Sequence, residues 1–141
     1  MQTSARNNFT GKVTAVTTGA VNDEITLTTA DGLELVAIIT HGSAASLGLK
    51  QGSEAFALIK ASSVVVMVGA DASKVSARNC IKGTVASVQE GAVNSEVVIE
   101  AAGGAMIVSI ITNDSVDRLG LAKGSEASAI FKASSVIIGV Q

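Results

Sequence analysis

The chain has 141 residues, of which 48% are hydrophobic and 16% are charged, and its formal net charge at pH 7 is -2. Without a basic tail or patch, this balance argues against a nucleic-acid or membrane-surface partner. Its apolar runs are short, so we expect no membrane-spanning segment, and the stretch MQTSARNNF lacks a signal core, so we expect a cytoplasmic protein. The single cysteine, Cys80, and single histidine, His41, exclude a disulfide framework and a histidine-rich metal site.

The first half of the chain has the pattern of short β-strands. Polar and apolar side chains alternate in its first two stretches, which is the period of a strand with one buried face. Asp31 and Gly32 supply a hairpin turn between the second and third stretches. The last two stretches are rich in branched residues. We expect strands at residues 9–16, 24–29, 33–40, 55–59 and 63–68.

One helical turn is expected between the third and fourth strands, in the sequence Ser-Ala-Ala-Ser-Leu-Gly-Leu at residues 43–49. Ser43 is expected to cap its start. Gly48 is suited to the left-handed position after its end, with Leu49 folding back on the turn. Five strands with a short helix between the third and fourth are the order of an OB-type barrel.

The second half of the chain repeats the first. A shift of 72 positions takes Ser4 to Ser76 without a gap, and about half of the overlapping positions are identical. We therefore expect an all-β protein with two OB-like five-stranded barrels in tandem, each with one short helix. The expected domains are residues 1–69 and 76–141, joined by a linker at 70–75. Domains this small are marginal alone, and oligomer formation is a common remedy.

The polar residues that occur in both repeats are mainly hydrogen-bond donors. No catalytic constellation recurs, so we expect a protein that is not an enzyme. Hydroxyls, amides, a guanidinium and an ammonium suit an oxyanion, above all a fully deprotonated tetrahedral dianion. The alternative is that serines and asparagines form turns and that the lysine is solvated. In the first repeat the recurring donors are Ser4, Arg6, Asn7, Asn22, Thr40, Ser43, Lys60, Ser62 and Ser63.

Several short motifs recur in both repeats with the same order and spacing. They are Ser-Ala-Arg-Asn, Gly-Ala-Val-Asn-x-Glu, Thr-x-x-Ser-x-x-x-Leu-Gly-Leu, Gly-Ser-Glu-Ala and Lys-Ala-Ser-Ser-Val. Together they resemble the Mop domain of the molbindins, in its tandem two-domain form. The resemblance implies an OB-like barrel and a cytoplasmic role in molybdenum storage and homeostasis. It also implies hydrogen-bonded molybdate or tungstate at domain and subunit interfaces, no cofactor, and a homotrimer.

The resemblance also implies two kinds of oxyanion site. The first kind would use Ser4, Arg6, Thr40, Ser43, Lys60, Ala61 and Ser62, and in the second repeat Ser76, Arg78, Thr112, Ser115, Lys132, Ala133 and Ser134. The second kind would use the turns Ala20, Val21, Asn22 and Ala92, Val93, Asn94. Asp114, which Gly42 replaces in the first repeat, would repel an anion at Ser115 unless it points away, so the two repeats need not bind equally.

Two other readings compete with oxyanion binding. An OB-like fold can bind single-stranded nucleic acid, but such surfaces need a positive groove and aromatic platforms. This chain has three phenylalanines, no tryptophan and no tyrosine. The remaining reading is a purely structural or interaction protein, in which the recurring donors only cap turns.

Overall fold

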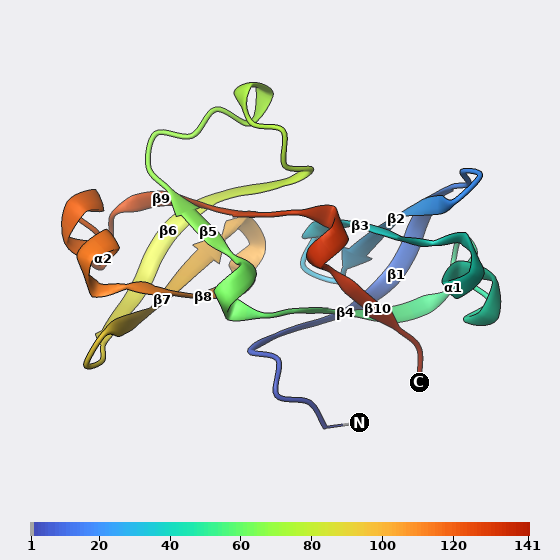
Figure 1. Ribbon diagram of the computed structural model, residues 1–141, viewed down its shortest axis with the longest axis horizontal. Helices are drawn as coiled ribbons and strands as arrows, with labels where there is room; N and C mark the ends of the chain where they lie inside the picture. The colour runs from blue at the N-terminus through green and yellow to red at the C-terminus, as the bar shows by residue number, and fades with distance from the viewer. Residues whose placement is uncertain (1) are drawn as a thin grey trace. The chain divides into compact units, whose positions relative to one another are not determined.

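A computed structural model describes residues 2–141 of the chain. It is an all-β structure of two five-stranded antiparallel sheets with two short α-helices (Figure 1). This architecture confirms the fold class expected from the sequence. No helix among the described residues is both long and apolar enough to cross a membrane.

The first sheet has the strand order β10-β4-β1-β2-β3, and every neighbouring pair is antiparallel. Its edge strands β10 and β3 also contact each other, so the sheet curls toward closure. The helix α1 (His41–Ser46) and the 3-10 turn η4 (Ala133–Ser135) belong to the same unit as this sheet. Its strands are β1 (Asn7–Thr17), β2 (Asn22–Thr29), β3 (Glu34–Thr40), β4 (Glu54–Ile59) and β10 (Ile137–Gly139).

The second sheet repeats this plan in the order β5-β9-β6-β7-β8. The helix α2 (Asn113–Leu119) and the 3-10 turns η1 (Ala61–Ser63) and η3 (Ala102–Gly104) belong to it. The strands are β5 (Val65–Met67), β6 (Asn79–Glu90), β7 (Asn94–Ala101), β8 (Met106–Thr112) and β9 (Glu126–Phe131).

The compact units of the structure differ from the contiguous repeats of the sequence. One unit combines residues 2–60 with Lys132–Gln141, and the other is Ala61–Phe131. Accordingly, β10 of the second repeat pairs with β4 of the first, while β5 of the first repeat pairs with β9 of the second (Figure 1). Each unit therefore takes its last strand from the other repeat, an exchange that the repeat boundaries in the sequence do not reveal.

The cores of the two units use equivalent positions. In the first unit Ile25 and Leu27 alternate along β2 with less buried residues, and both are fully buried. Val97 and Ile99 take the same places in β7 and are also fully buried. Burial of such side chains stabilises a fold by about 1.5–3 kcal/mol each, so this alternation fixes which face of each sheet points inward.

The helix α1 begins earlier than the sequence suggested. Its N-cap is Thr40, whose side chain accepts from the Ser43 amide, so the expectation that Ser43 is the cap was wrong. The cap lies three residues earlier because β3 runs directly into the helix at Thr40. The expected end of the helix is confirmed, since Gly48 has φ +64° and the Leu49 amide donates to the Ala44 carbonyl.

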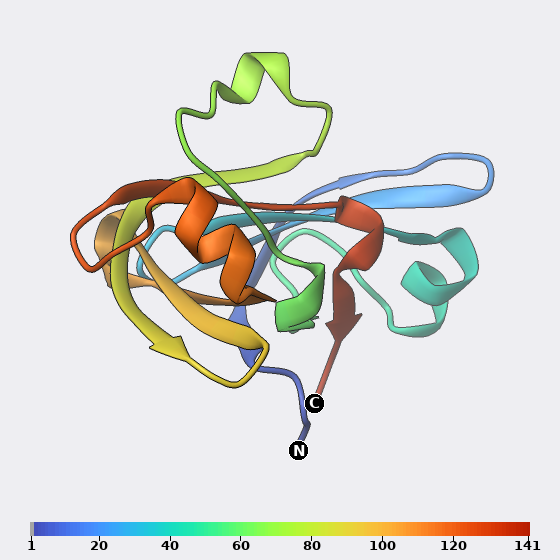
Figure 2. The ribbon, with the colours of Figure 1, turned by 60° about the vertical axis from the view of Figure 1, so that its left-hand side comes forward.

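The segment between β5 and β6 forms an arch that carries the 3-10 turn η2 (Ala72–Lys74) (Figures 1 and 2). Asp71 caps this turn through the side chain and the amide of Ser73. The hydrogen bond from the Ser73 hydroxyl, and then that from its amide, hold the pKa of Asp71 below its ordinary value of 3.8. The carboxylate is therefore ionised at neutral pH, and its capping is lost only as the pH falls through that lowered pKa.

Candidate functional site

A cleft of about 510 Å³ opens in the first unit between the end of β3, the helix α1 and the exchanged C-terminal segment. Its polar lining consists of hydroxyl groups and one amide side chain, and no lining residue is charged. The lining residues are Asn22, Ile38, Ile39, Thr40, Ser43, Ser46, Leu47, Ser134, Val136, Ile137 and Ile138.

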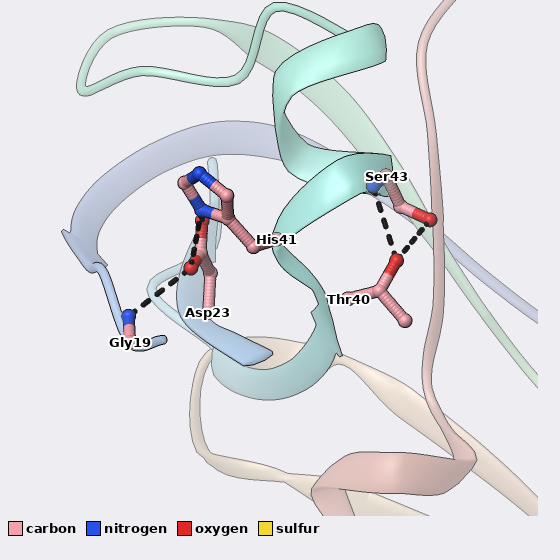
Figure 3. Close-up of polar contacts among 5 residues, drawn as sticks. All are labelled: Gly19, Asp23, Thr40, His41 and Ser43. Carbon is pink, nitrogen blue, oxygen red and sulfur yellow. Dashed lines mark hydrogen bonds and ion pairs between the residues drawn. The ribbon is translucent and has the colours of Figure 1, made fainter. Parts of the chain in front are cut away.

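Thr40 and Ser43 place two hydroxyl groups side by side at the start of α1. The Thr40 hydroxyl donates to the Ser43 Oγ over 2.7 Å and accepts from the Ser43 amide over 3.0 Å. Figure 3 shows both side chains on the side of α1 along which the C-terminal segment passes. Because both hydroxyls are exposed and can rotate, they are available to a ligand that accepts hydrogen bonds.

Ser134 reaches this cleft from the second repeat. It lies in η4, which packs against β3 because the exchange brings Lys132–Gln141 into the first unit. The serine at the same position of the first repeat, Ser62, lies in the other unit instead. The cleft is thus composed of residues from both repeats.

A buried carboxylate fixes the turn beside this cleft. The Asp23 side chain is 4% exposed and accepts from the His41 Nδ1 over 3.0 Å and from the Gly19 amide over 3.2 Å. The His41 amide also donates to the Val21 carbonyl over 2.9 Å. Figure 3 shows that His41 and Asp23 lie on the opposite side of the α1 start from Thr40 and Ser43. The pair therefore links the turn at residues 19–22 to α1 on the side away from the Thr40 and Ser43 hydroxyls.

The second unit makes the same link with neutral groups. Ser95 and Asn113 stand where the first repeat has Asp23 and His41, and the Ser95 hydroxyl donates to the Asn113 Oδ1 over 2.5 Å. The side-chain nitrogen Nδ2 of Asn113 donates in turn to the Gly91 carbonyl over 2.9 Å. The two positions have thus changed together, from an ionisable pair to a neutral pair.

The hydroxyl pair also recurs in the second unit. Thr112 caps α2, accepting from the Ser115 amide over 3.1 Å and donating to the Ser115 Oγ over 2.9 Å. The Arg118 side chain donates to Asp114 over 3.1 Å and to the Ser115 Oγ over 3.3 Å. Asp114 is therefore paired with a cation, which weakens the repulsion that the sequence suggested for an anion at Ser115.

Both repeats match one domain family. Residues 3–66 and residues 75–138 each match the family described as the TOBE domain. The chain belongs to the TOBE-domain family. The two matches cover nearly all of this TOBE-domain protein, and they fall on its two sequence repeats.

Several relatives of this TOBE-domain protein have names that refer to molybdenum. The solved structure of ModG, described as a cytoplasmic molybdate-binding protein with molybdate bound, is 45% identical, covers 100% of both chains and has a TM-score of 0.94. MopA of Rhodobacter capsulatus, a molybdenum-pterin-binding protein, is 46% identical over 140 residues, 99% of this chain and 53% of its own length. Molybdenum-pterin-binding protein 1 of Clostridium pasteurianum is 47% identical over 64 residues, 45% of this chain and 94% of its own. These likenesses confirm the resemblance to the molbindins.

The chain spans about half the length of its longer relatives. Besides MopA, the molybdenum transport protein ModE of Herbaspirillum seropedicae is 46% identical over 100% of this chain but only 52% of its own length. Those longer proteins thus contain a further region that has no counterpart in these 141 residues.

The structure distributes the residues expected for oxyanion binding between the two units of this TOBE-domain protein. Most of them are exposed, whereas Ala61 and Ala133 are buried and Ser115 is half-buried. The first unit holds Ser4, Arg6, Ala20, Val21, Asn22, Thr40, Ser43, Lys60, Lys132, Ala133 and Ser134. The second unit holds Ala61, Ser62, Ser76, Arg78, Ala92, Val93, Asn94, Thr112 and Ser115.

Sequence reasoning missed two features of the site. It did not place Ser134 beside Thr40, because the exchange of the last strands leaves no local mark on the sequence; the predicted grouping of Ser62 with Thr40 as ligands stays a prediction. It also gave no role to Asp23, although the joint change to Ser95 and Asn113 was a readable signal.

Among the described residues, no group of three or more His, Cys, Asp or Glu side chains could hold a metal ion.

Proposed function

We propose that this TOBE-domain protein binds molybdate, and tungstate as well, through hydrogen bonds and without catalysing a reaction. Its role would be storage and homeostasis of molybdenum in the cytoplasm. The observation that carries the proposal is the cleft in which Thr40, Ser43, Ser134 and Asn22 present donors with no carboxylate among them. The likeness to ModG, whose structure holds molybdate, supports the same ligand.

The chemistry of the cleft favours a fully deprotonated tetrahedral dianion. Hydroxyl and amide groups can donate hydrogen bonds to the oxygens of such an anion. A protonated phosphate brings a donor of its own, and the lining holds no carboxylate to accept it. Molybdate and tungstate are also larger than sulfate and phosphate and nearly equal in size, so a cleft shaped for one holds the other.

We further propose that the protein is a homotrimer in which neighbouring copies complete the oxyanion sites. Large apolar side chains are exposed at equivalent positions of both repeats, which favours burial against other copies. Val21 and Val93 are 73% and 70% exposed, and Val65 and Ile137 are 56% and 57% exposed. The remaining expected ligands, Ser4, Arg6, Lys60 and their counterparts in the second repeat, would act in such shared sites.

Binding of single-stranded nucleic acid receives less support from the structure. Two of the three phenylalanines, Phe56 and Phe131, are 7% and 2% exposed and belong to the core. They cannot stack on bases, and the net charge of -2 does not favour binding of a polyanion.

Equilibrium dialysis tests the proposed ligand. At neutral pH we expect the protein to retain molybdate and tungstate in the presence of excess sulfate or phosphate. Ser134→Ala removes one hydrogen bond to a charged ligand, so we expect about tenfold or more weaker binding at the first-unit site. Ser135→Ala is the control, because Ser135 follows Ser134 in the sequence but its side chain does not line the cleft. Equal retention of phosphate and molybdate would refute the proposal.

A further inference from the structure

The exchange of last strands raises a question that backbone pairing alone does not answer. In each unit the last strand pairs antiparallel with its partner over three residues. The two repeats are about half identical, so either copy of the last strand would present the same backbone groups to either sheet. Side chains that differ between the two copies can therefore favour one arrangement over the other.

At one of the three paired positions, the two last strands carry side chains of very different size, and so do the strands opposite them. In the first unit Gly139 lies opposite Phe56, and in the second unit Met67 lies opposite Ser128. Each pair combines one large and one small residue, in opposite orders. Directly opposite residues of antiparallel strands share a face and interact most strongly across the pair.

The Phe56 ring occupies the space above Gly139. A Cβ atom added at Gly139 would lie 2.3 Å from the Phe56 Cζ and 2.6 Å from its Cε2, closer than real contacts allow. Phe56 is only 7% exposed, and its ring covers a glycine of a strand at the sheet edge. An aromatic ring over an edge glycine is a known way to fix strand register.

We infer that these four residues select the exchanged pairing and thereby decide that Ser134, and not Ser62, completes the cleft of the first unit. If each repeat kept its own last strand, Met67 would lie opposite Phe56 and Gly139 opposite Ser128. The first pair would be overpacked and the second would leave a void, and both faults destabilise a core. The exchanged pairing of the last strands avoids both the overpacked pair and the void. It also places Ser134 beside Thr40 and Ser43. The inference holds whatever anion the cleft binds.

Engineered disulfides report the pairing in the full chain, with Cys80→Ser as background. Leu58 lies opposite Ile137 in the exchanged arrangement and would lie opposite Val65 in the other. Opposite Cα atoms in antiparallel strands are close enough for a disulfide. With native residues elsewhere, we expect Leu58→Cys to crosslink with Ile137→Cys and not with Val65→Cys.

The decisive variant is Met67→Gly with Gly139→Met, which reverses the sizes on the two last strands. We expect the ratio of the two crosslinks to shift by about tenfold or more toward the pairing within each repeat, as overpacking predicts. Adding Phe56→Ser and Ser128→Phe should restore the original ratio. The matched control is Val66→Ile with Ile138→Val, because both of those residues lie opposite alanines, Ala129 and Ala57.

The outcomes separate cleanly. Crosslink ratios that stay native in the two-residue variant, as in the control, would overturn the inference. If that variant does not fold, the four-residue variant decides, because recovery of folding and of the Leu58–Ile137 crosslink supports the size rule and failure refutes it. Neither readout involves molybdate, so a failed dialysis experiment leaves this test intact.

Discussion

Asp23 and His41 form a polar link between β2 and α1 in the first unit, and the second unit replaces both residues. The Asp23 carboxylate has 4% exposure and two bonded partners, the His41 ring and the Gly19 amide. Removal of this acceptor takes away both hydrogen bonds, each of which contributes about 0.5–1.5 kcal/mol net to stability. The neutral pair Ser95 and Asn113 shows that the backbone accepts a different solution at the same two positions.

Asp23→Ala should therefore lower the free energy of unfolding by about 1–3 kcal/mol, measured by urea unfolding. The double variant Asp23→Ser with His41→Asn installs the pair of the second repeat and should recover most of the loss. A single variant as stable as the native chain would show that the carboxylate contributes nothing to the turn.

Lys60 and Lys132 are exposed in the structure, and each directly precedes an Ala-Ser-Ser turn. In the trimer that we propose, they would supply charge-assisted hydrogen bonds to the oxyanion. Lys60→Ala with Lys132→Ala should then weaken molybdate binding about ten- to a hundredfold, which corresponds to about 1.5–3 kcal/mol, while the circular dichroism spectrum stays native. Lys50→Ala with Lys123→Ala makes the same change in net charge and should bind normally. Normal binding by the first pair would show that those lysines are only solvated.

At the scale of elements, the exchange makes each half of the chain dependent on the other. A fragment of residues 1–69 lacks β10, and a fragment of residues 76–141 lacks β5. When the two fragments are mixed, we expect a 1:1 complex that forms in preference to either homodimer, because only the complex provides both size-matched strand pairs. Native mass spectrometry measures the species. A statistical mixture of homodimers and complex would contradict this expectation.

The elements themselves were predictable, and the way they are exchanged was not. The strands around Val13 and Ile25 follow from alternation, and the helix end follows from the glycine at position 48, which adopts a φ of +64° in the structure. These features depend on neighbours in the sequence. The cap at Thr40 and the partner of Ser134 were missed, since one depends on where β3 ends and the other on contacts between residues far apart in the chain.

At the scale of the whole molecule, the proposed trimer makes assembly depend on the ligand. An anion bound only by the assembled state stabilises that state by mass action, and a hundredfold excess over Kd contributes about 2.7 kcal/mol. Molybdate should therefore raise the Tm and keep the trimer intact on dilution, as followed by light scattering. A monomer that binds molybdate with full stoichiometry would show that copies do not share sites.

The division of the chain into a continuous and a discontinuous unit also sets an order of events during synthesis. The continuous unit, Ala61–Phe131, has all of its residues before Lys132 is added, whereas the other unit needs Lys132–Gln141 to supply β10. At about 5–20 residues per second, the ribosome takes roughly 4–14 s to make that intervening stretch of 71 residues. The part of the chain that is made first is therefore completed last, and during that interval the edge of β4 has no partner from β10. A nascent chain of this protein is thus most exposed to wrong pairing in its oldest segment.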